Sequence, residues 1–240
     1  MRDFRRLNNP SYSTTFNFID RVDAFIFHND YFSSKLGGKL VRYSNDEIKL
    51  WKSPNVEFLQ ICLSRTEQLL NREGVLCLSL QLAGRSLFIF SFLICNGRLF
   101  NDSGPILFLS RIQGASGQFD SIKKINMSMG NLSNVLLSAL EGIALSLNIK
   151  QIICVSASNQ IQFNSDGPKS NFHSTYDEFL IKNGALFRGD GFFALSVPLP
   201  AKNFNTGRSH RSRHKKHSEI RFEISESVRA VMQSEIQKKN

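Results

Sequence analysis

A long apolar stretch over residues 75–95 constrains the fold of this 240-residue chain more than any other feature. Its length would suit a membrane span, but Gln81, Gly84 and Arg85 stand near its middle. Arginine at the centre of a span costs about 2.5 to 3.5 kcal/mol on insertion scales, whereas a turn at Ala83-Gly84-Arg85 between two strands keeps it in water. The stretch therefore predicts a β-hairpin, and we expect no integral membrane segment.

Short apolar runs bounded by turn residues predict the strands of the chain. In order they cover residues 75–82, 86–95, 106–112, 152–155, 185–187 and 192–197. Helical patterns lie between them, and the clearest has a broad apolar face over residues 132–147, with Asn131 available as the N-cap. Shorter helices are expected at residues 118–129 and 175–182. Helices inserted between strands predict a mixed α/β fold, a central sheet flanked by helices, over residues 74–200.

The N-terminal part of the chain carries helical spacing rather than strand alternation. Apolar residues recur three or four positions apart in two groups, Phe18, Val22, Phe25 and Ile26 in the first and Phe58, Ile61, Cys62 and Leu69 in the second. Ser53-Pro54 predicts the start of the second helix, because proline is tolerated in a first turn, and this helix is expected to end near Leu70. We therefore predict a helical N-terminal region over residues 1–73.

The C-terminal part, residues 201–240, combines a basic linker with helical spacing. Ile220, Ile224, Val228 and Val231 predict an amphipathic helix that docks on the body or on a partner. Five basic residues before it are candidate polyanion contacts: Arg208, Arg211, Arg213, Lys215 and Lys216. The formal net charge of +10 favours an anionic partner, which can be RNA, an anionic membrane surface or an acidic protein. A basic stretch that is merely solvated explains the same charges equally well.

The cysteines favour a reduced compartment. They are widely spaced, form no C-x-x-C pair and lie mostly in apolar runs, as buried free thiols do: Cys62, Cys77, Cys95 and Cys154. Asp20, Arg21 and Asp23 interrupt the first apolar stretch, so we expect no secretory signal. The chain is predicted to be cytoplasmic, with a peripheral position at the inner membrane left open.

The histidines do not indicate a metal site. His210, His214 and His217 share one face of a helix, but the surrounding arginines and lysines would repel a dication. A solvated basic segment is therefore the favoured interpretation. His28 and His173 are isolated in the sequence, and we expect each to be a surface or capping residue.

Several short motifs, taken in order, resemble the VirK/YbjX family of enterobacterial proteins. They are Arg72-Glu73-Gly74-Val75-Leu76-Cys77-Leu78, Arg111-Ile112-Gln113-Gly114, Leu136-Leu137-Ser138-Ala139-Leu140, Ile153-Cys154-Val155-Ser156, Tyr176-Asp177-Glu178-Phe179 with Asn183-Gly184, and Asp190-Gly191-Phe192-Phe193 with Leu195. Gln160 stands where the family pattern has a histidine. The resemblance implies an accessory virulence protein, linked to the envelope, to tolerance of antimicrobial peptides or to production of a surface factor. It implies no particular reaction.

The order of strands and helices is also similar to that of the GNAT acyltransferases. The similarity implies that a loop after a strand binds the pyrophosphate of acyl-CoA through backbone N–H groups. The matching residues are Arg111, Gln113, Gly114, Ala115, Ser116 and Gly117, with Asn159 after the next strand. These enzymes often have a tyrosine that acts as the general acid, and Phe179-Leu180 stands at its position here. No catalytic residue is therefore assigned. A strand-to-helix turn that only needs small residues is the competing interpretation of the loop.

Two hypotheses follow for the function. The first is a virulence-associated accessory protein with a GNAT-like core, for which acyl transfer from acyl-CoA is left open. The second is a non-enzymatic binding protein whose basic C-terminal part engages an anionic partner.

Overall fold

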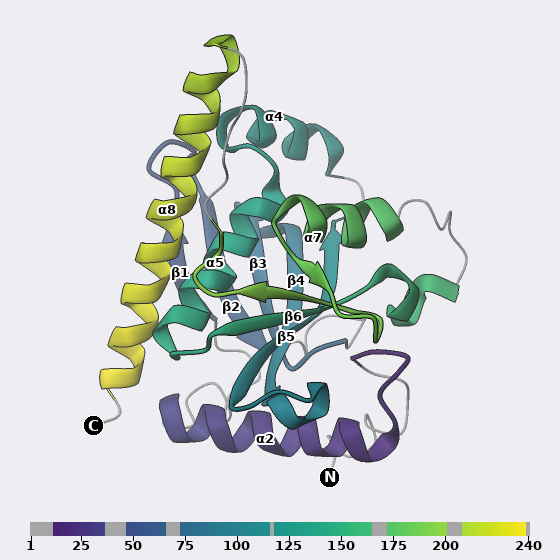
Figure 1. Ribbon diagram of the computed structural model, residues 1–240. Helices are drawn as coiled ribbons and strands as arrows, with labels where there is room; N and C mark the ends of the chain where they lie inside the picture. The colour runs from purple at the N-terminus through teal and green to yellow at the C-terminus, as the bar shows by residue number, and fades with distance from the viewer. Residues whose placement is uncertain are drawn as a thin grey trace.

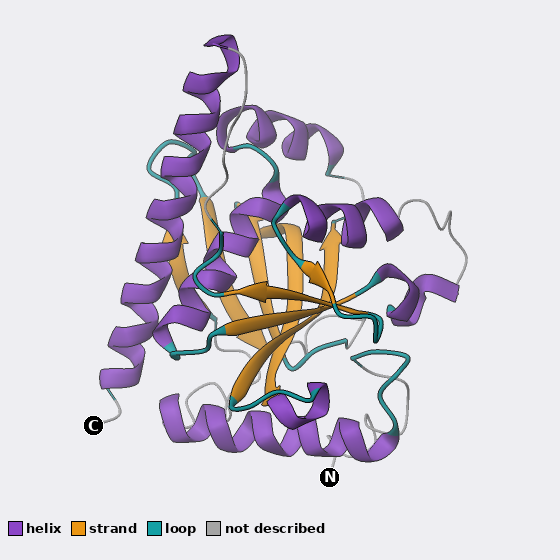
Figure 2. Ribbon diagram, in the orientation of Figure 1, coloured by secondary structure: helices purple, strands orange, loops and turns teal. Residues whose placement is uncertain are grey.

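The computed structural model describes residues 12–36, 47–65, 73–115, 118–164, 172–200 and 208–238. Among these residues eight strands form one mixed sheet (Figure 1), and Figure 2 shows the helices around it. The strands are β1 (Ile48–Lys52), β2 (Leu59–Arg65), β3 (Leu76–Leu82), β4 (Arg85–Asn96), β5 (Pro105–Gly114), β6 (Gln151–Val155), β7 (Leu186–Phe187) and β8 (Phe192–Ser196). They lie in the order β1-β2-β3-β4-β5-β6-β8-β7. The helices are α2 (Phe18–Leu36), α4 (Phe119–Met129), α5 (Leu132–Ser146), α7 (Phe179–Lys182) and α8 (Arg208–Gln237). The predicted mixed α/β fold is confirmed.

The hairpin predicted from the long apolar stretch is present as β3 and β4. Leu82 pairs with Arg85, and the two residues between them, Ala83 and Gly84, both have positive φ angles, of 48° and 76°. This two-residue turn matches the right-handed twist of the strands it joins. Arg85 is exposed at the turn, so its charge stays in water as expected. No helix in the described part of the chain is both long and apolar enough to cross a membrane.

Strand β5 lies where the sheet changes from antiparallel to parallel pairing. It pairs antiparallel with β4, but the register shifts so that Ser110 lies between the residues opposite Ser91 and Phe92, which is a β-bulge. On its other side β5 pairs parallel with β6, and α4 and α5 form the crossover that a parallel connection requires. The parallel pairing runs from Leu107 to Leu109, whereas β5 continues to Gly114. We call residues 110–114 the β5 extension.

Helix α5 lies between the sheet and the C-terminal helix (Figure 1). Asn131 caps it as predicted, because its side chain accepts a hydrogen bond of 3.0 Å from the N–H of Ser133. Helix α8 packs along α5 with Ile224, Val228 and Met232 fully buried. The two helices cross closely at Gly142, where a Cβ would collide with the carbonyl oxygen of Ser225. The predicted amphipathic C-terminal helix is therefore confirmed, and it docks on the body.

The prediction of a helical region over residues 1–73 is wrong for its second half. Residues 48–65 form β1 and β2, which extend the sheet, and the described helix of this region is α2. The spacing of Phe58, Ile61 and Cys62 fits a helix, but Leu59, Ile61 and Leu63 also alternate as in a strand, and these three side chains are fully buried. Pairing with β3 decides between the two patterns, and that contact lies outside the local sequence.

Two smaller expectations also need correction. The basic stretch after residue 207 is part of α8 and not a linker, while residues 201–207 lie outside the described residues. His28 is buried in α2 rather than on the surface, with its ring stacked on Phe32. The four cysteines are buried and free, as predicted.

Candidate functional site

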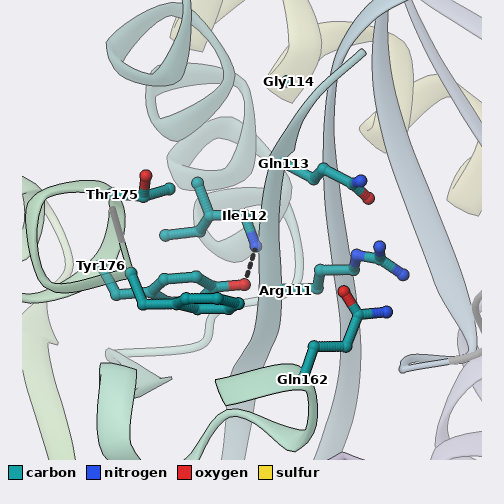
Figure 3. A pocket seen from close by; sticks show the side chains of 8 residues that line it. Arg111, Ile112, Gln113, Gly114, Gln162, Thr175 and Tyr176 are labelled. Carbon is teal, nitrogen blue, oxygen red and sulfur yellow. Dashed lines mark hydrogen bonds between the residues drawn. The ribbon is translucent and has the colours of Figure 1, made fainter. Parts of the chain in front are cut away.

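A pocket of about 190 Å³ opens beside the β5 extension (Figure 3). Its described lining comes from β5, from the turn after β6 and from the helical segment that leads into α7. The residues are Arg111, Ile112, Gln113, Gly114, Gln162, Phe172, Thr175 and Tyr176. The pocket lies where β5 runs past the end of its parallel pairing with β6. Beyond that point the lining opposite β5 comes from the turn after β6 and from the segment before α7.

The backbone of the β5 extension contributes polar groups to this pocket. The N–H of Ala115 points toward β4, where it donates to the carbonyl of Leu87 over 2.9 Å. The N–H of Ile112 points the other way and donates to the hydroxyl of Tyr176 over 3.0 Å. Because backbone groups alternate along a strand, the N–H and C=O of Gly114 point to the same side as those of Ile112. Two backbone positions of β5 therefore face the pocket.

Tyr176 forms the inner wall of the pocket, and Figure 3 shows its hydroxyl directed at Ile112. Its ring stacks on Phe172 with centroids 6.2 Å apart. The helical segment is held by Asp177, whose carboxylate accepts from the N–H of Ala157 over 2.8 Å and contacts His173 over 2.7 Å. Burial raises the pKa of Tyr176, although the Ile112 hydrogen bond opposes the shift. The phenol is therefore neutral at physiological pH and can act as a hydrogen-bond donor.

A buried polar cluster lies behind this wall. The carboxylate of Glu73 accepts a hydrogen bond from the side chain of Gln160, and one of its oxygens is 3.9 Å from Nε of Arg111. Gln160 also interacts with the side chain of Tyr176. Burial raises the pKa of Glu73, while Arg111 and Gln160 oppose that shift because both favour the carboxylate. Glu73, Arg111 and Gln160 thus support Tyr176 from the protein interior.

Ser110, the bulge residue, connects this cluster to the sheet through hydrogen bonds. Its hydroxyl hydrogen-bonds with the carbonyl oxygen of Glu73 and, over 3.0 Å, with that of Ser91. A bulge bends a strand and increases its local twist. The bulge lies next to Leu109, where the pairing with β6 ends, so it helps to direct the β5 extension away from β6.

The structure brings together only part of the predicted cofactor loop. Arg111, Gln113 and Gly114 line the pocket, and Ala115 follows them directly at the end of β5. Arg111 is only 4% exposed and is partnered by Glu73, so its charge is directed inward rather than toward a phosphate. Ser116 and Gly117 lie outside the described residues.

Asn159 does not belong to the pocket. Its side-chain amide donates to the carbonyl of Gly191 over 3.2 Å, and its own carbonyl accepts from the N–H of Thr14 over 3.0 Å. A Cβ at Gly191 would collide with this amide, so the two residues are closely packed. Asn159 thus connects the turn after β6 to the N-terminal segment and to the residue before β8. Its position does not support the prediction that it binds a cofactor.

Sequence reasoning missed Glu73, Gln160 and Tyr176 as site residues. The GNAT pattern places a tyrosine at the position of Phe179-Leu180, and Tyr176 lies about one helical turn before that pair. A search one turn upstream would therefore have found it. Glu73 and Gln160 are 87 positions apart, and no local spacing links them.

The candidate polyanion contacts lie in the first turns of α8. The side chains of Lys215 and Lys216 are exposed, and Nζ of Lys215 is 3.9 Å from Glu219. The side chains of Arg208, Arg211 and Arg213 lie outside what the structure describes. Two of the five predicted cations are therefore placed on an exposed helical surface.

The fold and the pocket together define a mixed α/β protein with a pocket at the open end of a parallel strand pair. A family model described as "Protein of unknown function (DUF535)" matches residues 4–234. Because this match covers nearly the whole chain, the protein belongs to the DUF535 family. A search of curated proteins found no match, and neither did a search of solved structures.

Proposed function

We propose that this protein is an acyl-CoA-dependent acyltransferase whose donor binds along the β5 extension. One observation carries the proposal: β5 continues past its parallel partner β6 and leaves a pocket faced by the backbone of Gly114, next to Ile112, whose N–H donates to Tyr176. An extended chain that bears amide groups, such as the pantetheine arm of CoA, can hydrogen-bond to such an edge as an added strand would. The similarity to GNAT enzymes seen in the sequence implies the same placement.

The end of β5 also suits the phosphates of the donor. Helix α4 begins at Phe119, four positions after Ala115. The N-terminus of a helix presents free N–H groups and a positive dipole, and both favour a phosphate. The predicted loop Gln113–Gly117 would then act through its backbone, while Arg111 supports Tyr176 from behind. The role of Ser116 and Gly117 stays a prediction.

The chemistry that the pocket supports is direct transfer. The nucleophilic atom of the acceptor forms a bond to the thioester carbonyl carbon, and the carbon–sulfur bond breaks. The neutral hydroxyl of Tyr176 stabilises the leaving thiolate by donating a hydrogen bond to the sulfur. The acceptor loses one proton to water and the CoA thiolate gains one from water, so the reaction is balanced without a further reactant.

Calorimetry with CoA tests this function. Gly114→Trp places a large ring at the pocket and is expected to weaken CoA binding at least tenfold. Gly114→Ala is the matched control, because its Cβ would lie 3.4 Å from the ring of Phe88, which is a tolerable contact, and its binding should stay near that of the wild type. A wild-type protein that does not bind CoA would remove the acyltransferase proposal.

We propose further that this DUF535 protein belongs with the VirK/YbjX proteins, as its sequence motifs imply. Under that assignment the acyl acceptor belongs to the cell envelope or to the production of a surface virulence factor. The support is the order of the quoted motifs, two of which, residues 111–114 and 176–179, contribute side chains to the pocket.

A second candidate function is binding of a polyanion by the first turns of α8, and the exposure of Lys215 and Lys216 favours it. Removing α8 is unsuitable as a test, because Ile224, Val228 and Met232 are core residues. The charge reversals Lys215→Glu and Lys216→Glu are expected to abolish binding to RNA or to anionic vesicles. Lys52→Glu, an exposed lysine on β1, is the control, and equal losses in all three variants would indicate only a net-charge effect.

A further inference from the structure

We infer that β7 is a dimerisation edge, at which a second copy of this chain adds its own β7 as an antiparallel strand. The sheet has two outer strands, β1 at one end and β7 at the other. An outer strand offers backbone groups to any further strand, so proteins protect such edges with lysines, bulges or a covering helix. The two edges of this sheet differ in that protection. The inference does not depend on the proposed acyl transfer.

Strand β1 is protected in three ways. Lys49 and Lys52 are exposed on it. Its pairing with β2 shifts register between Lys49 and Trp51, which is a β-bulge. Helix α8 packs beside it (Figure 1), and the indole N–H of Trp51 donates to the carboxylate of Glu223 over 3.3 Å. This edge is therefore poorly suited to accept a further strand.

Strand β7 carries neither a charge nor a proline. It consists of Leu186 and Phe187, which are 75% and 60% exposed. A tight turn joins it to α7, in which the N–H of Gly184 donates to the carbonyl of Ile181 over 2.9 Å, and Ile181 is 59% exposed. Exposed apolar side chains thus gather at this outer strand. Apolar surface beside an unprotected strand is typical of an interaction site.

The backbone of Phe187 faces the free side of β7. The N–H of Arg188 donates to the carbonyl of Phe192 over 2.9 Å, which directs Arg188 toward β8. Backbone groups alternate between the two sides of a strand, so the N–H and C=O of Phe187 point away from β8. An antiparallel strand on that side can form a hydrogen-bonded pair with Phe187, in which each residue donates its N–H to the carbonyl of the other.

A second β7 fits this edge because the pairing is self-complementary. A two-fold axis through the Phe187 pair places Phe187 opposite the same residue of the second copy, as an isologous interface requires. The two Cα atoms then lie about 5.5 Å apart, so the two rings can meet. They extend the existing contact between the rings of Phe187 and Phe193, whose centroids are 5.2 Å apart. In this register Arg188 lies opposite Leu186 of the second copy, so no like charges oppose each other at the strand.

Closure of the assembly favours a second copy over a strand of another protein. When two β7 edges pair, the outer strands of the joined sheet are the two protected β1 strands, so growth stops at two copies. A foreign strand would instead add a new edge that needs protection of its own.

The area available for the contact predicts a weak dimer. An aromatic side chain buries about 150 to 250 Å², and three partly exposed side chains per copy together give less than the roughly 1,200 Å² of a stable complex. We therefore expect a dimer that dissociates on dilution.

Sedimentation velocity of the full chain, from about 1 to 500 µM, tests the inference. The average mass of the wild type should rise with concentration from monomer toward dimer. Phe187→Lys places two like charges opposite each other and should weaken association at least tenfold. Phe222→Lys is the matched control, because it makes the same change at a ring of α8 that is 70% exposed, and it should associate as the wild type does.

Mixing two variants tests the two-fold pairing itself. Phe187→Glu alone should also stay monomeric, but an equal mixture of Phe187→Lys and Phe187→Glu places opposite charges face to face. The mixture should associate at least tenfold more tightly than either variant alone. Thermal melts of each variant check that it folds, which is expected because the replaced ring is mostly exposed.

Three results would overturn the inference. A wild type that stays monomeric at about 500 µM would leave β7 to a strand of another protein. Equal losses of association in Phe187→Lys and Phe222→Lys, or no loss in either, would show that β7 does not hold the dimer. A mixture of the two Phe187 variants that stays monomeric would contradict the pairing of Phe187 with itself.

Discussion

Acidification should destabilise this protein through His28, a residue of α2. The side chain is 2% exposed, and its Nδ1 accepts a hydrogen bond of 3.0 Å from the backbone N–H of Ile94 in β4. An accepting Nδ1 carries no proton, so the neutral ring is the form that fits this site. Burial and, to a smaller extent, the charge of Arg65 lower the pKa of His28 to about 3.

The sign of the effect follows from proton linkage. The unfolded chain binds a proton at His28 below its ordinary pKa of about 6.5, while the folded chain does not until about pH 3. The stabilisation by the neutral histidine is therefore complete above pH 6.5 and is lost as the pH falls toward 3. One pKa unit corresponds to about 1.4 kcal/mol, so the free energy of unfolding should drop by about 2 kcal/mol between pH 7 and pH 5 from this residue alone.

Urea unfolding at pH 7 and at pH 5 measures this drop, and His28→Asn isolates it. The amide oxygen of asparagine can accept the Ile94 hydrogen bond near the position of Nδ1, but asparagine does not titrate. The variant is expected to be less stable at both pH values, because it leaves a small cavity. Its loss between pH 7 and pH 5 should be about 2 kcal/mol smaller than that of the wild type. Equal losses in the two proteins would refute the reasoning.

Three further variants test other parts of the structure. Tyr176→Phe should lower the rate of acyl transfer about 100-fold or more, with little change in CoA binding by calorimetry; an unchanged rate would remove the role of the hydroxyl. Gly142→Ala should lower the free energy of unfolding by about 1 to 3 kcal/mol in a thermal melt, because the new Cβ collides with the carbonyl oxygen of Ser225. Helix propensity alone predicts the opposite, a gain of about 1 kcal/mol. Gln160→Leu should destabilise the fold by about 1 to 3 kcal/mol in urea, because the carboxylate of Glu73 loses a buried donor, and a neutral result would show that this hydrogen bond is weak.

The elements that the sequence predicts correctly are those encoded by adjacent residues. The β3–β4 hairpin follows from the Ala83-Gly84 turn between two apolar runs, and α5 follows from its cap at Asn131 and its apolar face. Strand β2 was predicted as a helix because Phe58, Ile61 and Cys62 satisfy the helical period. Pairing with β3 over the whole of β2 outweighs that local preference.

The site residues also fall into those that local sequence can indicate and those that only the fold brings together. The stretch from Arg111 to Gly114 could be singled out because its glycine lies at the end of a strand. The partners of Arg111 could not, since Glu73 precedes β3 and Gln160 follows β6, and only the folded sheet brings them together. The direction of the Arg111 side chain also depends on these partners, so the sequence could name Arg111 as a cofactor-loop residue but could not show that its charge faces Glu73.

The buried pair Glu73–Arg111 is better explained by the pocket than by stability. Replacing a buried ion pair with apolar residues of similar size is often neutral or stabilising, so such a pair is weak evidence for a contribution to folding. This pair lies behind the pocket wall, beside the Ser110 bulge, where β5 leaves β6. It surrounds Tyr176 with groups that fix its hydroxyl and its protonation state. Apolar residues in place of this cluster would leave the hydroxyl of Tyr176 with the N–H of Ile112 but without its polar neighbours in the interior, so the cluster is better explained by the support of Tyr176 than by the stability of the fold.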